Sequence, residues 1–275
     1  MKTKHQHIEV RNLTMAYGSF TLMRDVSFEV QQGSVMVIMG GSGCGKSTLL
    51  RHMLGLIEPA QGEILYNGNS FTNASRKERR IMLRKFGVLY QGGALWSDMT
   101  LAENIALPIR EYTKLSDSKI ADITKHKLSL VGLEGFEDFY PSDISGGMAK
   151  RAGLARAMAL DPEILFFDEP SAGLDPISAK RLDDLILEMR DRLETTIVVV
   201  THELASIFAI ADRCVYLDND THTMLAQGTP DELLKNPPDP KIRTFLKRGE
   251  EGESGATCRL PARHNKKSKG ARNHE

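Results

Sequence analysis

The sequence lacks the features of a membrane-embedded or secreted chain. No apolar run reaches the roughly 18 residues that a membrane-spanning helix needs. The first ten residues are polar and contain no apolar stretch typical of a signal peptide. If the protein works on a membrane, we therefore expect another chain to span it.

Cysteine is also scarce, and the chain has no net charge. Its three cysteines, Cys44, Cys214 and Cys258, form neither a CxxC pair nor a disulfide-framework pattern, which favours free thiols in a reducing cytosol. Lys+Arg and Asp+Glu both total 36, so the formal net charge is zero. No overall electrostatic field indicates nucleic acid as a partner.

What the sequence does contain is the pattern of an α/β protein. Three short apolar runs, at residues 35–39, 164–167 and 197–200, predict strands covered on both faces, as in a parallel sheet between helices. Apolar residues at helical spacing follow the first run at 47–56 and precede the second at 148–160. With 275 residues, 41% of them hydrophobic, the chain can bury a full core.

Two additions to this core are expected. Residues 8–30 alternate partially, with a break at 17–19, and residues 62–68 are typical of a short strand that ends in a turn. These segments predict an antiparallel β subdomain. From about residue 93 to residue 160 the signal is predominantly helical, which predicts an inserted α-helical subdomain.

The composition changes towards the carboxyl terminus. The chain is rich in Glu, Gly and Ser from Gly249, and then becomes basic, with few large apolar residues. The cations of this segment are Arg259, Arg263, Lys266, Lys267, Lys269 and Arg272. We predict one domain over residues 1–248 and a disordered basic tail over 249–275, either solvated or in contact with anionic lipid or an assembly partner.

The segment GGSGCGKS at residues 40–47 matches the phosphate-loop pattern GxxxxGK[ST] and lies between a predicted strand and a predicted helix. Its glycines allow backbone N–H groups to surround an anion at the start of the helix. We expect Lys46 to contact the β- and γ-phosphates of ATP, Ser47 to ligate Mg²⁺, and Thr48 to approach the α-phosphate. The expected nucleotide contacts are Gly40, Gly41, Ser42, Gly43, Cys44, Gly45, Lys46, Ser47 and Thr48.

Two acidic residues follow the second apolar run. Asp168 and Glu169 come at the carboxyl end of a buried strand, which places them at the sheet edge where the phosphate loop is expected. We expect Asp168 to hold Mg²⁺ through its water shell and Glu169 to act as general base on the attacking water. The alternative interpretation is that this pair lies at the start of a helix, where acidic side chains interact favourably with the helix dipole.

A second anion-binding pattern distinguishes this chain from other phosphate-loop proteins. In ISGGM at residues 144–148, Ser145 can cap a helix, while Gly146 and Gly147 expose backbone N–H groups at its start. Here the sequence resembles the ABC ATPase family, whose signature is usually LSGGQ. The resemblance implies a homodimer in which each ATP lies between one phosphate loop and the signature helix of the other copy.

Other positions match this family in the expected order. By resemblance, Tyr17 stacks on adenine, Gln91 links Mg²⁺ and water to the permease contact, and His202 hydrogen-bonds the γ-phosphate. The segment SAGLD, which ends at Asp175, is similar to the loop that lies across the dimer seam. Taken singly, a Tyr in a strand or a His after one is more often structural.

Less general positions narrow the resemblance, which covers roughly residues 8–246. The segments 91–99, 107–111, 145–151 and 236–240 are similar to ATPases of Mla-type, MCE-associated lipid transporters. This resemblance implies a peripheral subunit on the cytoplasmic face of the inner membrane, bound to multi-pass permease subunits, an MCE-domain protein and accessory subunits. The lipid cargo would not touch this chain, and nucleic acid is not expected as a partner.

Two positions depart from the usual family pattern, and three alternative functions are also considered. Met148 replaces the usual signature Gln, which favours the lipid-transporter resemblance, and Glu203 stands where many relatives have Asp. One rival is a nucleic-acid-linked ABC protein, which would usually have paired cassettes, a coiled-coil insertion or a strongly basic surface. A second is a phosphate-loop kinase, which would not need the Ser145 pattern. A third is an ABC transporter for a solute, metal or drug.

Overall fold

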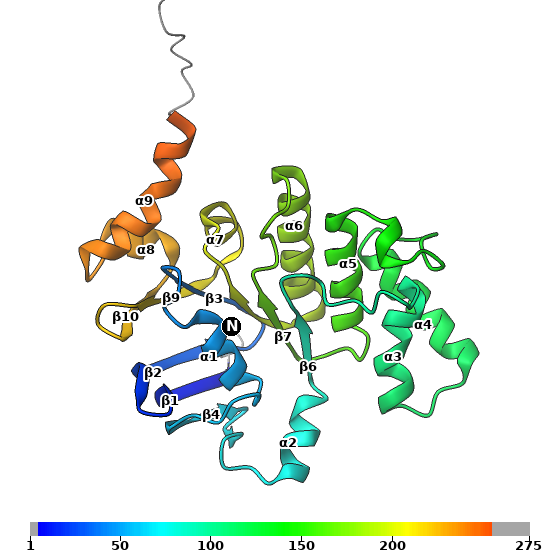
Figure 1. The fold of residues 1–275 in the computed structure, drawn as a ribbon, viewed down its shortest axis with the longest axis horizontal. Helices are drawn as coiled ribbons and strands as arrows, with labels where there is room; N and C mark the ends of the chain where they lie inside the picture. Colours follow the sequence, from blue (N-terminus) through cyan, green and yellow to red (C-terminus); the bar gives the residue numbers. More distant parts are fainter. Residues whose placement is uncertain (1–4, 255–275) are drawn as a thin grey trace, which may run out of the picture.

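A computed structural model of the chain describes residues 5–254 and contains two β-sheets and two groups of helices (Figure 1). The larger sheet has six strands and is parallel except at one edge. In spatial order its strands are β10 (Thr223–Gly228), β9 (Arg213–Asp218), β3 (Val35–Gly40), β8 (Thr196–Val200), β7 (Ile164–Asp168) and β6 (Phe86–Leu89). Only β10 is antiparallel, paired with β9.

The central strands of this sheet are buried on both faces, as their continuous apolar runs predict. Every residue of β3 and β8 is buried. Met36 and Ile38 belong to one hydrophobic cluster, whereas Val35, Val37 and Met39 belong to the other. Because successive side chains of a strand point to opposite faces, β3 contributes to both cores.

The smaller sheet is antiparallel and forms the expected β subdomain. Its strands, in spatial order, are β2 (Phe20–Gln31), β1 (Gln6–Tyr17), β4 (Gln61–Tyr66) and β5 (Asn69–Ser70). The β1–β2 turn lies at Gly18, where the alternation of the sequence breaks. This sheet packs against the larger sheet and α1 (Lys46–Met53) through one shared core.

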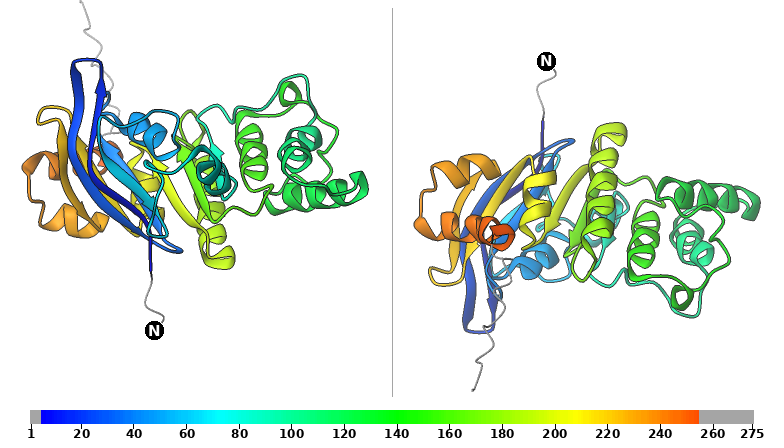
Figure 2. Two further views of the ribbon diagram at one scale, coloured as in Figure 1. Left: turned by 90° about the horizontal axis from the view of Figure 1, so that it is seen from below. Right: turned by 90° about the horizontal axis from the view of Figure 1, so that it is seen from above.

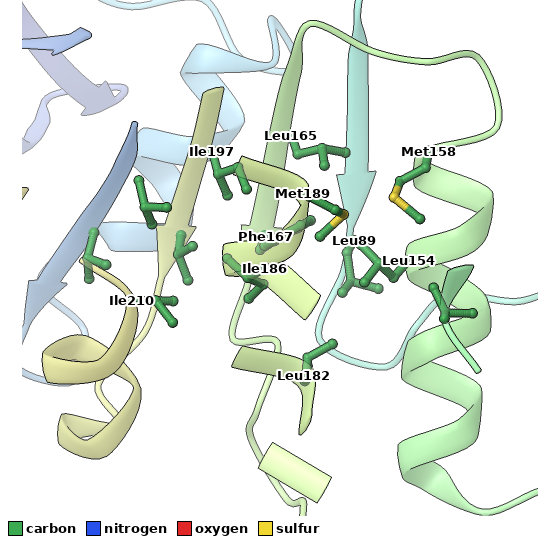
Figure 3. Packing of buried hydrophobic residues seen from close by; sticks show 14 of the residues in the cluster. Leu89, Leu154, Met158, Leu165, Phe167, Leu182, Ile186, Met189, Ile197 and Ile210 are labelled. Carbon is green, nitrogen blue, oxygen red and sulfur yellow. The ribbon is translucent and has the colours of Figure 1, made fainter. Parts of the chain in front are cut away.

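Within residues 5–254, seven helices cover the opposite face of the larger sheet and one end of the molecule. They are α3 (Leu101–Tyr112), α4 (Asp117–Leu130), α5 (Gly146–Ala157), α6 (Pro176–Leu193), α7 (Leu204–Ile210), α8 (Pro230–Lys235) and α9 (Pro240–Ser254), with a 3₁₀ turn η1 (Pro141–Asp143). Helix α2 (Arg76–Leu83) lies apart from them, beside the antiparallel sheet (Figure 1). Figure 3 shows Ile186 and Met189 of α6 packed with Leu165 and Phe167 of β7. Figure 2 shows α3–α5 and the antiparallel sheet at opposite ends of the parallel sheet.

These features confirm the fold class expected from the sequence, while three boundaries differ. The helix after the phosphate loop ends at Met53 because Gly55 takes a left-handed conformation (φ 68°). The helix expected over 148–160 is α5, which starts earlier, at Gly146, and ends at Ala157.

Helix α9 runs to Ser254 and so extends into residues 249–254 of the expected tail. This helix is anchored by the buried Ile242 and Leu246, and adding a residue to an established helix costs far less than starting one. Residues 255–275 of the expected tail lie outside the described residues. Across residues 5–254, no helix has the length and apolar character required to cross a membrane.

Candidate nucleotide-binding site

The phosphate loop connects β3 to α1 at the carboxyl edge of the parallel sheet. A Cβ on Gly40 would come within 2.3 Å of the Leu217 carbonyl oxygen, so only glycine fits there. Gly43 and Gly45 have left-handed φ angles of 76° and 94°. Gly45 caps α1 without any side-chain hydrogen bond, which leaves the first N–H groups of the helix available to an anion.

The Lys46 ammonium is held against this loop. Its Nζ donates to the carbonyl oxygens of Gly40 and Gly41, each at 3.0 Å, and the residue is buried. The lysine therefore adds a positive charge beside the open amides of α1. Charge and amides together favour a phosphate group at this position.

Ser47 and Asp168 meet although 121 positions separate them. Ser47 Oγ donates to Asp168 Oδ1 at 2.9 Å, because β7 ends beside the start of α1. Within residues 5–254, no group of three or more His, Cys, Asp or Glu side chains could hold a metal ion. The oxygen atoms of Ser47 and Asp168 fit Mg²⁺, which prefers few protein ligands together with phosphate oxygens and water.

Glu169 and His202 also meet at this edge, since β7 and β8 are adjacent parallel strands. His202 Nδ1 lies 2.8 Å from Glu169 Oε1. The other carboxylate oxygen, Oε2, is buried and has no hydrogen-bond partner among the described residues. Glu169 is also held at φ 49°, a conformation rare for side chains other than glycine and typical of functional sites.

These residues line one pocket of about 780 Å³, within the size range of ligand sites. Its lining residues are Tyr17, Leu22, Gly40, Gly41, Ser42, Gly43, Gly45, Lys46, Ser47, Thr48, Gln91, Glu169, His202, Leu204 and Phe245. Tyr17 is 48% exposed, and its hydroxyl lies 3.4 Å from Thr48 Oγ1. The expected nucleotide side chains from the phosphate loop, the strand ends and Tyr17 thus share one cavity, with Asp168 directly behind Ser47.

Of the large apolar and aromatic residues that line the pocket, only Tyr17 was predicted from the sequence. Leu22, Leu204 and Phe245 line it together with Tyr17. Phe245 comes from α9 and packs edge-on against Tyr216, with ring centroids 5.4 Å apart. No local sequence signal links residues of β2, α7 and α9, so only the fold identifies this wall.

Cys44 differs from the other expected contacts. Its side chain is fully buried and lies beneath the loop, where a Cβ on Gly40 would meet its Sγ at 2.7 Å. Burial raises the pKa of the Cys44 thiol. The side chain of Cys44 thus points away from the pocket, and the expected nucleotide contact of this residue stays a prediction for its backbone N–H.

Gln91 lies at the rim of the pocket, on a segment that α5 holds in place. Arg156 donates to the carbonyl oxygens of Ala94 at 2.7 Å and Gly93 at 3.0 Å. A Cβ on Gly153 would come within 2.8 Å of the Gly93 oxygen, so α5 and this segment are in close contact. Sequence reasoning missed Arg156 because its partners are backbone atoms far along the chain.

The remaining expected contacts form a second group outside the pocket. Ser145 Oγ accepts a hydrogen bond from Met148 N at 3.3 Å and caps α5, while Asp175 caps α6 with bonds of 3.0 Å from Ile177 N and Ser178 N. A Cβ on Gly147 would lie 3.2 Å from Ser178 Oγ, so the two helix starts are neighbours. None of Ser145, Gly146, Gly147 and Asp175 lines the pocket.

Lys150 fastens this second group to the loop after Glu169. Its Nζ donates to the Ala172 carbonyl oxygen, and burial lowers the pKa of its ammonium. The loop from Glu169 to Asp175 therefore bridges the pocket and the second group of residues. Sequence reasoning did not single out Lys150.

Fold and pocket together define the class: a phosphate-loop protein that binds and hydrolyses a nucleoside triphosphate. A family model described as "ABC transporter" matches residues 23–172 of the 275. The chain belongs to the ABC transporter family, as an ATP-binding and ATP-hydrolysing subunit.

Three similar proteins illustrate this membership. The "Probable ribonucleotide transport ATP-binding protein mkl" of Mycobacterium leprae is 42% identical over 239 residues, which cover 87% of this chain and 68% of that protein. The "Intermembrane phospholipid transport system ATP-binding protein MlaF" of Haemophilus influenzae is 40% identical over 245 residues, which cover 89% and 92%. A solved dimeric ATP-binding cassette in a post-hydrolysis state, bound to ADP and Pi, is 26% identical with a TM-score of 0.73, covering 81% of this chain and 98% of that one.

Proposed function

We propose that this ATPase powers phospholipid transport between the inner and outer membranes and so maintains outer-membrane lipid asymmetry. The observation that carries this proposal is the likeness to the H. influenzae protein, which is named for such transport and matches over 92% of its length. In this setting the chain is a peripheral subunit on the cytoplasmic face of the inner membrane. Its partners are multi-pass permease subunits, an MCE-domain protein and accessory subunits. The transported lipid, as cargo, does not contact this chain.

Ribonucleotide transport is the second candidate cargo. The M. leprae protein named for it is 42% identical to this chain. Both cargoes need the same ATP-driven motor, so the pocket supports the two candidates equally. The fuller coverage of the H. influenzae relative favours phospholipid.

In the pocket, we assign phosphate binding to the loop amides and Lys46, with Thr48 beside the α-phosphate and Tyr17 against adenine. The open amides of α1 and the buried ammonium support this assignment. Ser47, Asp168 through water, and Gln91 would hold Mg²⁺, which when bound would neutralise charge on the phosphate oxygens. The oxygen donors and the absence of a protein metal cage in residues 5–254 fit this arrangement.

We assign the role of general base to Glu169. Its unpaired Oε2 is the acceptor suited to a water molecule, while Oε1 is bonded to His202 Nδ1. As the water oxygen bonds to the γ-phosphorus, the bond to the β–γ bridging oxygen breaks and Glu169 takes the proton, which yields ADP and phosphate. His202 Nε2, which lies 4.0 Å from Glu203 Oε1, is the ring nitrogen that we assign to the γ-phosphate.

The separation of the two anion-binding groups supports action as a homodimer. Ser145, Gly146, Gly147 and Asp175 lie outside the pocket of their own chain, so they would complete the pocket of a second copy. The dimeric state of the similar cassette bound to ADP and Pi agrees with this arrangement. Contacts to the γ-phosphate would then be lost on hydrolysis, and the dimer would open.

A groove beside the Gln91 segment is the proposed permease contact. Its volume is about 550 Å³, and Leu83, Arg84, Leu107, Tyr112, Arg156 and Leu160 are among its lining residues. Because Arg156 also holds the carbonyls of Gly93 and Ala94, a helix bound in the groove would act directly on the segment that carries Gln91. This contact would couple transport to the pocket.

Co-purification of the tagged protein from its native membrane in mild detergent tests the proposal. Subunits and lipids bound to the chain are identified by mass spectrometry. A multi-pass permease with an MCE-domain protein and phospholipid is the expected result. A solute-binding protein with another permease would overturn the cargo, and recovery with DNA or ribosomes would overturn transport.

A further inference from the structure

Helix α2 is unusual in burying none of its residues. It begins with a capping box, in which Ser75 and Glu78 exchange hydrogen bonds. Arg79 attaches it to the antiparallel sheet: its guanidinium donates to the carbonyl oxygens of Phe71 and Thr72, forms an ion pair with Glu58, and lies 5.5 Å from the Phe71 ring centroid. The helix is thus held along one side by these polar contacts and by the partly buried Met82, and it projects at the lower edge of Figure 1.

The opposite side of α2 is basic. At about 100° per residue, Arg76, Arg80 and Arg84 fall in one row with Lys77 beside them, whereas Glu78 falls on the far side of the helix. Arg76, Lys77 and Arg80 are exposed, and no ion pair within residues 5–254 involves any of them. The row spans about 12 Å at about 1.5 Å per residue.

Aliphatic side chains border this basic row. Ile81 is 55% exposed and Leu83 42% exposed, and they fall on either side of the row. Between α2 and the end of α3 lies an open hollow of about 960 Å³, lined by Arg76, Lys77, Arg80, Leu83 and Tyr112 among others. The Arg84 guanidinium lies 5.3 Å from the centroid of the Tyr112 ring, which lines this hollow. We define the basic face as Arg76, Lys77, Arg80, Arg84, Ile81 and Leu83.

The basic face needs an extended anionic partner. Arg76, Lys77 and Arg80 have no ion-pair partner among the described residues and repel one another, and an eight-residue helix has little stability of its own. Cations in the centre with aliphatic side chains at the border are typical of segments that lie on an anionic lipid surface, where the cations meet headgroups and the aliphatic groups enter the interface. A phosphate-lined nucleic acid would match the cations but not the exposed aliphatic residues.

The position of α2 also favours a membrane. The helix leads directly into β6 and the Gln91 segment, and Leu83, Arg84 and Tyr112 belong both to the neighbourhood of the basic face and to the groove described above. If that groove receives the permease, the basic face lies on the same side of the molecule. For this orientation the inference rests on the proposed function.

We propose that the basic face of α2 docks directly on the anionic phospholipid headgroups of the membrane that contains the permease. The chain then has a lipid contact of its own, separate from the permease. Each cation near an anionic surface contributes about 1 kcal/mol, or roughly fivefold in partitioning.

Co-sedimentation of the purified full chain with lipid vesicles tests this proposal without any permease. The vesicles are phosphatidylcholine alone or phosphatidylcholine mixed with phosphatidylglycerol. The variant is Arg76→Gln/Lys77→Gln/Arg80→Gln, and the matched control, Lys266→Gln/Lys267→Gln/Lys269→Gln, loses the same charge from the basic tail. Circular dichroism and ATPase rate verify that the α2 variant is folded, because α2 does not line the nucleotide pocket.

We expect the unmodified chain to bind only the anionic vesicles, and the α2 variant to bind on the order of 100-fold more weakly, with a smaller loss in the tail control. Binding of the α2 variant equal to that of the unmodified chain, or an equal loss in both variants, would overturn the proposal. A photo-crosslinker at position 81 provides a second measurement in the native membrane. Capture of lipid supports the proposal, and capture of a permease segment alone overturns it, whatever cargo the co-purification identifies.

Discussion

The pocket at the phosphate loop and the start of α5 are the two phosphate sites that we propose, and they differ in how complete they are. The pocket joins residues from β3, β7, β8 and α1 through direct bonds, such as Ser47 to Asp168 and His202 to Glu169. The start of α5 offers Ser145 and two glycines, with Ser145 and Gly146 exposed. One region is thus organised for chemistry within the chain, and the other presents its donors outward.

This difference indicates where each region can be used. A helix start with exposed N–H groups binds an anion only when the anion is brought to it. Lys150 fixes the start of α5 to the loop after Glu169, so a ligand held at α5 would also act on the loop that leads from the proposed base. The chain therefore contains two separate groups of residues, which are joined through the loop from Glu169 to Asp175.

The largest expected effect comes from Glu169→Gln, which tests the chemistry of the pocket. The amide cannot accept the proton of the attacking water, so kcat should fall on the order of 10² to 10⁴-fold while nucleotide binding is retained. Steady-state ATPase assays and equilibrium binding of a labelled nucleotide measure the two quantities. A rate unchanged from that of the unmodified protein would assign the base to another residue.

Ser145→Arg tests the start of α5. The larger cationic side chain should prevent a second copy from approaching, so ATPase activity should fall about 100-fold, while a single chain still binds nucleotide. Gel filtration with bound ATP would show loss of the dimer. Full ATPase activity in this variant would rule out a site shared between copies.

Mixing two inactive variants sharpens the comparison further. In a dimer of one Lys46→Ala chain and one Ser145→Ala chain, which loses the hydroxyl without blocking the approach of a second copy, one composite site has both defects and the other has neither. Activity should therefore reappear on mixing, whereas each variant alone stays inactive. Failure to recover activity, with mixed dimers shown to form, would mean that both groups act within one chain.

Asp183 is connected through Ser206 to the loop that joins the two regions, and its buried carboxyl group gives a test of stability. It is buried on α6, accepts a hydrogen bond from Ser206 Oγ at 2.9 Å, and has its Oδ1 unpaired among the described residues; Ser206 Oγ in turn lies 3.5 Å from Ser171 Oγ in the bridging loop. Burial raises the pKa of Asp183 to about 6, and the hydrogen bond from Ser206 only partly opposes this.

Because the folded chain holds the Asp183 proton more tightly than the unfolded chain, stability should fall as the pH rises from about 4 through about 6 and stay lower above it. Asp183→Asn removes the buried charge, so relative to the unmodified protein it should gain roughly 2 kcal/mol in free energy of unfolding between pH 4 and pH 8. Urea unfolding at both pH values measures this gain. Parallel pH profiles for the two proteins would contradict it.

The parts of the fold that are encoded locally could be predicted from the sequence. The apolar runs that became β3, β7 and β8 are contiguous, and the glycines of the phosphate loop report the backbone conformation of their own turn. The position of Phe245 at the pocket and the bonds from Arg156 to Gly93 and Ala94 depend on packing between distant segments, which no local pattern encodes. Composition alone also does not show that a helix anchored at Ile242 continues to Ser254.

Cys44→Ala should have the smallest effect, and it separates backbone from side-chain contributions to the pocket. The thiol packs beneath Gly40 and contacts the core, so its removal leaves every loop amide in place. We expect kcat and KM within about twofold of the unmodified values and a loss of about 1 kcal/mol in stability from the small cavity. ATPase kinetics and thermal unfolding measure these effects, and Cys44→Leu is the matched overpacked variant. A large change in KM for Cys44→Ala would mean that the side chain, and not only the amide, faces the nucleotide, in which case the loop would have to rotate from the conformation described above.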